Sequence, residues 1–201
     1  MVALTTGDAA RAGCTDVERR VAAAFEAGLR GVVLREPELE DREYLALARR
    51  IVELARRSGD DAWVSLHDRV HLAVEAGADA VQLGGASLAP SVARELLPET
   101  VAIGFSIHQG DDPHVARGAD HLFLAPVFAT NSKPGAAPIG TEALGALHAA
   151  IGLPVFALGG VTPANAADCL RAGAAGVVVL SGILGSSDPA GATRRHLEAL
   201  R

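Results

Sequence analysis

The sequence contains few aromatic residues and few cysteines. Aromatic side chains make up 3% of the 201 residues, and the two cysteines are Cys14 and Cys169. Because their separation matches no metal-ligand spacing, we interpret them as ordinary reduced thiols of a cytosolic protein. The abundance of alanine, together with 22 glycines, favours close packing of helices on strands over an aromatic-rich binding groove.

Long apolar runs and an excess of positive charge are also missing. No uninterrupted apolar stretch approaches the ~20 residues that a membrane-spanning helix needs. The first residues, MVALTTGDAARAG, lack the basic and apolar regions of a signal peptide. A net charge of −6 argues against nucleic acid as a partner. We therefore expect a cytoplasmic protein that binds neither membrane nor nucleic acid, with one domain over residues 1–201.

An internal repeat dominates the sequence. In each copy a helix ends at a glycine, which can adopt the left-handed conformation, and a short apolar run follows. The runs lack polar alternation, as is typical of strands buried on both faces of a parallel sheet. The four copies are EAGLRGVVL at 26–34, EAGADAVQL at 75–83, RGADHLFL at 117–124 and RAGAAGVVVL at 171–180.

Four further apolar runs bring the number of predicted strands to eight: MVALTT, WVSLHD, VAIGFSIH and PVFALGG. Predicted helices separate the strands, at 16–28, 41–59, 69–77, 89–98, 111–118, 141–152, 163–173 and 189–201. Eight such units predict a compact (β/α)8 TIM barrel, with a doubly wound open sheet as the alternative. The one long connection, residues 129–142, is of the kind that is usually functional or mobile.

Chemistry in a TIM barrel lies at the carboxyl ends of the strands, and small residues follow the last two predicted strands. Gly159 and Gly160 follow one strand, and Ser181 and Gly182 follow the next. Such residues let backbone N–H groups approach an anion, and the starts of the following helices add partial positive charge. They predict a phosphate monoester site; the alternative is that they only form tight turns.

Two cations stand near other predicted strand exits. Arg35 suits a carboxylate or a phosphate, unless it pairs with Glu36 or Asp68. Lys133 belongs to Thr-Asn-Ser-Lys, which begins at Thr130. We expect this loop to bring a positive charge over an anion, the alternative being a solvated lysine.

Histidine supplies the candidate acid–base group. His108 follows a predicted strand and could transfer protons near neutral pH, or serve as a structural hydrogen-bonding group. His67 and Asp68 are weaker candidates, because Asp68 could instead cap a helix that begins near Arg69. The remaining histidines are interpreted as solvated: His71, His114, His121, His148 and His196.

Four motifs together resemble the thiamin phosphate synthase superfamily, which also contains the thiazole tautomerases. They are Leu-Arg-Glu at 34–36, Gly-Phe-Ser-Ile-His at 104–108, Thr-Asn-Ser-Lys at 130–133 and Gly-Gly-Val-Thr-Pro-Ala-Asn at 159–165. The resemblance covers essentially the whole chain. It implies a TIM barrel that acts on a thiazole phosphate in vitamin B1 synthesis and holds the phosphate on the last two loops.

Departures from the synthase motifs favour the tautomerase branch. Synthases join a pyrimidine pyrophosphate to the thiazole phosphate with Mg²⁺, and their Gln-Leu-Arg-x-Lys motif has Val33 and Pro37 at its ends here. Their Asn-Asp pair is replaced by His67-Asp68, and Ser87 occupies the position of an aspartate that helps to hold the metal. Together these changes leave a Mg²⁺-pyrophosphate site poorly equipped.

The resemblance therefore predicts a cofactor-independent thiazole tautomerase that aromatises carboxythiazole phosphate. His108 would move the proton, Arg35 or Lys133 would neutralise the carboxylate, and no metal is expected. The first alternative is a divergent thiamin phosphate synthase that needs Mg²⁺; the second is a non-catalytic barrel that binds thiazole phosphate. Barrels of this family commonly dimerise, so exposed apolar helix faces would allow a homodimer. The substrate-binding residues are predicted to be Arg35, His67, Asp68, Ser106, Thr130, Ser132, Lys133, Gly159, Gly160, Ser181 and Gly182.

Overall fold

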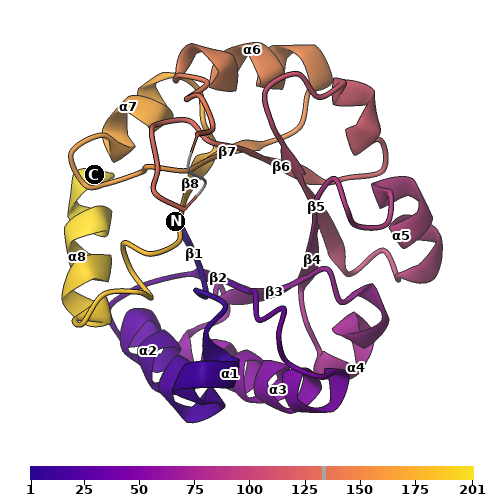
Figure 1. Cartoon of the computed structure of the whole chain (residues 1–201), viewed down its shortest axis with the longest axis vertical. Coiled ribbons are helices and arrows are strands. Elements are labelled where there is room, and N and C mark those ends of the chain that lie inside the picture. Colours follow the sequence, from indigo (N-terminus) through magenta and orange to yellow (C-terminus); the bar gives the residue numbers. More distant parts are fainter. Residues whose placement is uncertain (133–134) are drawn as a thin grey trace.

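A computed structural model describes residues 1–132 and 135–201, which form a closed barrel of eight parallel strands (Figure 1). Neighbouring strands pair in sequence order, and β1 closes the barrel against β8, with Val2 opposite Val178. The predicted TIM barrel is confirmed, and the open-sheet alternative is wrong because an open sheet has no such closing pair. The strands are β1 Val2–Leu4, β2 Gly31–Leu34, β3 Trp63–His67, β4 Ala80–Leu83, β5 Ala102–Ile107, β6 His121–Leu124, β7 Val155–Leu158 and β8 Gly176–Val179.

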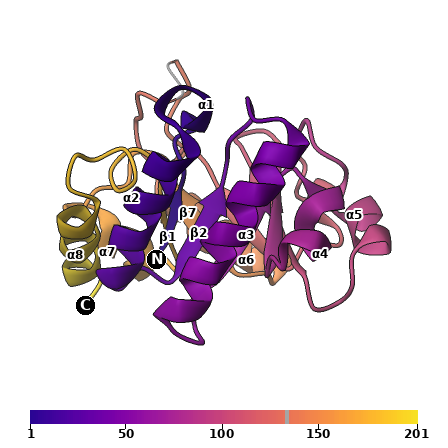
Figure 2. The same cartoon turned by 90° about the horizontal axis from the view of Figure 1, so that it is seen from below.

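The helices form a ring around the strands, and α1 lies at the end where the strands exit (Figures 1 and 2). This single turn was not predicted. The predicted helix at 111–118 is only the 3₁₀ turn η2, in which Asp112 accepts a hydrogen bond from the His114 N–H. The helical elements are α1 Ala9–Ala12, α2 Cys14–Glu26, α3 Asp41–Ser58, η1 Val70–Leu72, α4 Ala73–Ala76, α5 Pro90–Leu96, η2 Pro113–Ala116, α6 Glu142–Ile151, α7 Ala166–Arg171 and α8 Pro189–Ala199.

The barrel interior is apolar on one side and polar on the other. Side chains from β1, β2, β6 and β8 form an inner apolar cluster, which includes Leu4, Val33 and Phe123. Alternate residues of a strand share a face, and several interior positions of β3, β4 and β5 are occupied by small or polar residues. These are Ser65, Gln82, Gly104 and Ser106.

Two histidines that we expected to be solvated are not: His121 is half-buried and His196 is buried. His121 begins β6, where strand alternation places it on the interior face with Phe123, and its ring centroid lies 5.5 Å from that of Phe123. His196 is 3% exposed, and its Nδ1 lies 2.9 Å from the Ala192 carbonyl oxygen one turn earlier on α8. His71, His114 and His148 are exposed, as predicted.

Several large apolar side chains on neighbouring outer elements are exposed, with exposed fractions up to 64% at Leu96. They lie on α4, on α5 and the segment before it, and on η2: Val74, Leu88, Val92, Leu96 and Val115. The homodimer stays a prediction. Among the described helices, none has both the length and the apolar character needed to cross a membrane.

The half-buried position of His121 predicts a pH-dependent stability. Burial lowers the pKa of His121 to about 4, against 6.5 for an unperturbed histidine. The unfolded chain therefore binds the proton more readily between these values, and stability should fall as the pH drops from 6.5 towards 4. This histidine should account for up to about 3 kcal/mol of that loss. Urea unfolding across this pH range should show a shallower decline for His121→Phe, whereas exposed His148→Ala should follow the wild type. Equal slopes for all three proteins would contradict the prediction.

Candidate active site at the mouth of the barrel

A cavity of about 560 Å³ opens at the carboxyl ends of the strands. Most of the predicted site residues line it: Arg35, His67, Ser106, His108, Thr130, Ser132, Gly159, Gly160, Ser181 and Gly182. Asp68 is exposed and is not part of the lining, and Lys133 lies outside the described residues. The barrel therefore brings together groups from both halves of the sequence.

The loop after β7 requires glycine. Gly159 and Gly160 have φ values of 92° and 65°, in the left-handed region. A Cβ atom at Gly160 would lie 2.4 Å from the Ala129 carbonyl oxygen, and one at Gly159 would lie 2.8 Å from Pro126 Cα. Asn165 fixes the far side of the loop by donating to the Gly160 carbonyl oxygen at 3.0 Å. The same backbone conformation therefore forms the tight turn and exposes the backbone of the loop to the cavity.

Backbone N–H groups at the exits of β7 and β8 are available to an anion. In residues 1–132 and 135–201, no atom accepts a hydrogen bond from the N–H of Gly160, Val161, Ser181 or Gly182, although all four residues line the cavity. Adjacent unpaired N–H groups are the usual way in which a barrel of this kind holds a phosphate. This arrangement supports the predicted phosphate site.

Arg35 faces the cavity on a backbone that Thr5 holds in place. The Arg35 N–H donates to Thr5 Oγ1 at 2.8 Å, and Thr5 Oγ1 donates to the Arg35 carbonyl oxygen at 3.1 Å. Glu36, which is 2% exposed, instead accepts from the Ala9 N–H at 2.7 Å. Arg35 forms no ion pair within the described part of the chain, so its charge is available to a ligand.

The two histidines at the mouth have different surroundings. Burial, reinforced by the Arg35 charge and opposed by Asp68, lowers the pKa of His67, which favours a neutral ring at neutral pH. His108 is half-exposed, and its Nδ1 lies 3.6 Å from Asp111 Oδ2. Asp111 also accepts from the His108 N–H at 2.8 Å. His108 thus has a carboxylate beside its ring while the ring remains accessible from the cavity.

Gln82 also lines the cavity, although the sequence analysis did not select it. Its Nε2 donates to Ser106 Oγ at 3.0 Å. The available signal was a polar amide within the apolar run of β4. The alternative role for Asp68, a helix cap, is not found: it adopts φ 71°, and Arg69 precedes η1 without a side-chain cap.

The described residues include no cluster of side chains that would hold a metal ion without a substrate. No group of three or more His, Cys, Asp or Glu side chains among them could hold one, and no carboxylate lines the cavity. Ser87, at the position of the synthases' metal-binding aspartate, accepts a hydrogen bond from the Gly84 N–H at 2.8 Å. Its hydroxyl closes a turn.

Comparison with known proteins gives a consistent result. A family model described as thiamine monophosphate synthase matches residues 3–183. A putative thiamine-phosphate synthase of Geobacter sulfurreducens is 42% identical, over 96% of this chain and 91% of its own length. A thiamine-phosphate synthase of Moorella thermoacetica is 40% identical, over 90% and 86% of the respective lengths. The solved structure of thiamine phosphate pyrophosphorylase from Pyrococcus furiosus superposes with a TM-score of 0.84 at 29% identity, covering 99% of this chain and 94% of that one.

Substitution of Gly160 should separate crowding from backbone strain. Gly160→Ala adds a Cβ atom against the Ala129 carbonyl oxygen and keeps an unfavourable φ, so we expect a loss of about 2–4 kcal/mol in the free energy of unfolding. Gly110→Ala is the matched control, because Gly110 has φ 87° and no atom within 4 Å of the added Cβ. It should cost only about 1 kcal/mol by urea unfolding. Equal losses would show that the close approach is unimportant.

Removal of the Arg35 charge should weaken anion binding. We expect Arg35→Ala to reduce the affinity for inorganic pyrophosphate about tenfold or more, because hydrogen bonds to charged groups are lost. Added salt should shrink the difference if the guanidinium is partly solvated. Arg49→Ala removes a cation on α3 that already pairs with Glu75. Isothermal titration calorimetry should show no change for this control, and unaltered binding by Arg35→Ala would contradict the assignment.

Proposed function

Because the chain belongs to the thiamine monophosphate synthase family, we propose that it is a thiamine-phosphate synthase, a transferase that joins hydroxymethylpyrimidine pyrophosphate to a thiazole phosphate. The observation that carries this proposal is the 40% identity, over 90% of the chain, to a relative named for that activity. The same comparisons offer no support for the tautomerase branch that the departures in sequence favoured.

The mouth of the barrel offers binding groups for two phosphorylated substrates. The four N–H groups after β7 and β8 suit the single phosphate of the thiazole. Arg35, which follows β2, suits the pyrophosphate, since a guanidinium binds phosphate oxygens in a bidentate manner. Ser106 lies near the carboxyl end of β5. It can donate its hydroxyl hydrogen to a substrate because Gln82 already donates to its oxygen. These residues bind and orient the two substrates.

The family's synthases use Mg²⁺, and no cluster of three or more protein ligands for it occurs among the described residues. We therefore assign no step of the reaction to the metal. At this mouth the chain contributes positive charge and hydrogen-bond donors. These groups stabilise the negative charge that develops on the oxygen atoms of the leaving pyrophosphate.

A second candidate, the thiazole tautomerase, is favoured by one observation. The cavity lining has no carboxylate but includes His108, which has Asp111 beside its ring. Isomerisation of carboxythiazole phosphate would use the phosphate loops and Arg35 to clamp the two anionic ends of the substrate. His108 would then take a proton from one atom of the substrate and return it to another. Positioned proton transfer of this kind contributes about 10²–10⁴-fold to a rate.

One experiment separates the candidates. Purified protein is mixed with thiazole phosphate and hydroxymethylpyrimidine pyrophosphate, with and without Mg²⁺, and the products are followed by ³¹P and ¹H NMR. Formation of thiamine phosphate with release of pyrophosphate is the expected result. A parallel sample in D₂O contains the exocyclic tautomer of carboxythiazole phosphate, with His108→Ala as the test variant and the exposed His114→Ala as the control.

Each result has a distinct meaning. Metal-independent aromatisation without coupling, reduced about 10²–10⁴-fold by His108→Ala alone, would overturn the synthase in favour of the tautomerase. Binding of thiazole phosphate without either reaction would overturn both in favour of a non-catalytic barrel.

A further inference from the structure

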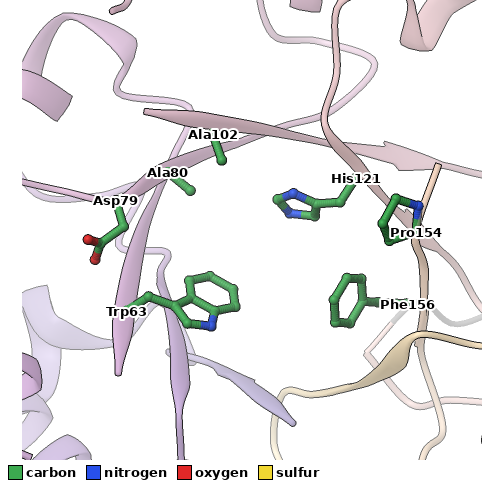
Figure 3. Close-up of a pocket in the computed structure, with 7 residues that line it drawn as sticks. All are labelled: Trp63, Asp79, Ala80, Ala102, His121, Pro154 and Phe156. Atoms are coloured by element: carbon green, nitrogen blue, oxygen red, sulfur yellow. The ribbon is translucent and has the colours of Figure 1, made fainter. Parts of the chain in front are cut away.

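The two cavities of the barrel differ in the charge that they offer to a ligand. Figure 3 shows the cavity of about 310 Å³ at the amino ends of the strands, bordered by the rings of Trp63, His121 and Phe156. Asp79 also lines this cavity, and its carboxylate already pairs with an arginine of α3. The mouth contains the guanidinium of Arg35, so the direction of that group matters most for a phosphorylated ligand.

The guanidinium of Arg35 is not held by a polar partner. In the part of the chain that the structure describes, the hydrogen bonds of Arg35 are those of its backbone with Thr5, and its side chain forms no ion pair. A long side chain that becomes ordered only when a ligand binds loses rotamer freedom at that moment, which weakens binding. Packing that directs the guanidinium beforehand would remove this cost.

The loop between β1 and α1, residues 5–8, supplies such packing. Gly7 in this loop has φ 81°, and a Cβ atom there would lie 3.1 Å from Arg35 Nη1, closer than an ordinary van der Waals contact. The same Cβ atom would lie 3.4 Å from Pro37 Cδ and 3.5 Å from the Arg35 carbonyl oxygen. The backbone of Gly7 therefore lies against the segment that follows β2 and forms a wall beside the guanidinium.

Glu36 fixes this loop in place. One carboxylate oxygen accepts from the Gly7 N–H at 3.3 Å, and the other accepts from the Ala9 N–H at 2.7 Å. Glu36 is 2% exposed, and a buried carboxylate is costly unless hydrogen bonds meet its charge. Hydrogen bonds to an ionised acceptor are also the stronger ones, so the two N–H groups are held firmly. The residue next to Arg35 thus determines where the wall beside Arg35 stands.

We propose that Glu36 and Gly7 are positioning residues for Arg35. The buried carboxylate fixes the loop at 5–8, and the backbone of Gly7 directs the guanidinium towards a phosphate group in the mouth before the ligand arrives. Neither Glu36 nor Gly7 lines the cavity, so both act through Arg35. The inference rests on the proposed function only for the identity of the ligand, a pyrophosphate ester.

The resting protein provides the first test, independent of any reaction. ¹⁵N relaxation of the Arg35 Nε–H group, assigned by its loss in Arg35→Lys, should show a more ordered side chain than that of the exposed Arg57. Gly7→Ala should shift this signal and lower its order, because the added Cβ atom displaces the guanidinium. Gly13→Ala is the matched control, since Gly13 has φ 90° and no atom within 4 Å of the added Cβ atom. Equal mobility of Arg35 and Arg57 in the wild type would overturn the proposal.

Binding of inorganic pyrophosphate, measured by calorimetry, provides the second test. Gly7→Ala should weaken binding about five- to tenfold, and Gly13→Ala should leave it unchanged. Glu36→Gln should also weaken it, because an amide has one oxygen and can accept from only one of the two N–H groups. In an Arg35→Ala background Glu36→Gln should add nothing.

The outcomes separate positioning from a general structural role. An undiminished effect of Glu36→Gln in the Arg35→Ala background, or equal effects of Gly7→Ala and Gly13→Ala, would overturn the proposal. If Glu36→Gln fails to fold, the two glycine variants still decide it. A protein that binds pyrophosphate but forms no thiamine phosphate would contradict the proposed function and leave both tests of positioning valid.

Discussion

The pairing of β1 with β8 is the constraint on which the rest of the molecule depends. Residues 2–3 and 178–179 are far apart in sequence, and their register closes the cylinder. Closure places the exits of β8, β1 and β2 side by side, so the N–H groups after β8 and the guanidinium of Arg35 face one cavity. Thr5 and Glu36 act at the same junction, because each bonds to backbone across the β1 and β2 loops.

Polar side chains of the barrel interior continue into the mouth. Side chains of β1, β2, β6 and β8 form the inner apolar cluster, while Ser65, Gln82 and Ser106 bring polar groups inside from β3, β4 and β5. Packing alone would favour an apolar filling throughout, since buried polar groups cost free energy unless they are paired. The polar sector ends at Ser106, on the side of the mouth that carries His67 and His108. The interior amide of Gln82 thus bonds directly to Ser106, a side chain that lines the mouth.

Much of the fold was predictable because the determining signals are local. The glycine-and-apolar repeat predicted four of the strands and further apolar runs predicted the other four, and the small residues after β7 and β8 indicated which loops would present their backbone. His121 was misjudged because it precedes the apolar part of its run, and only its pairing with β5 and the contacts of its ring with Phe123 and Phe156 show that its side chain points inward. Gln82 and α1 were missed for a related reason: their roles depend on contacts between distant segments. The choice between branches, read from Ser87 and Pro37, was not supported by the comparisons with relatives.

A phosphate site made from main-chain amides has a consequence for how such a barrel diverges. Every residue type except proline offers the same N–H, so substitutions at Val161 or Ser181 leave the N–H groups of the phosphate site in place. The side chains that determine the reaction, Arg35 and His108 among them, stand on other loops and can be exchanged separately. A family of such barrels can therefore keep its phosphate site while the reaction that it catalyses changes. Gly159 and Gly160, which shape the site, are the residues least free to vary, because a Cβ atom at either would clash with neighbouring backbone.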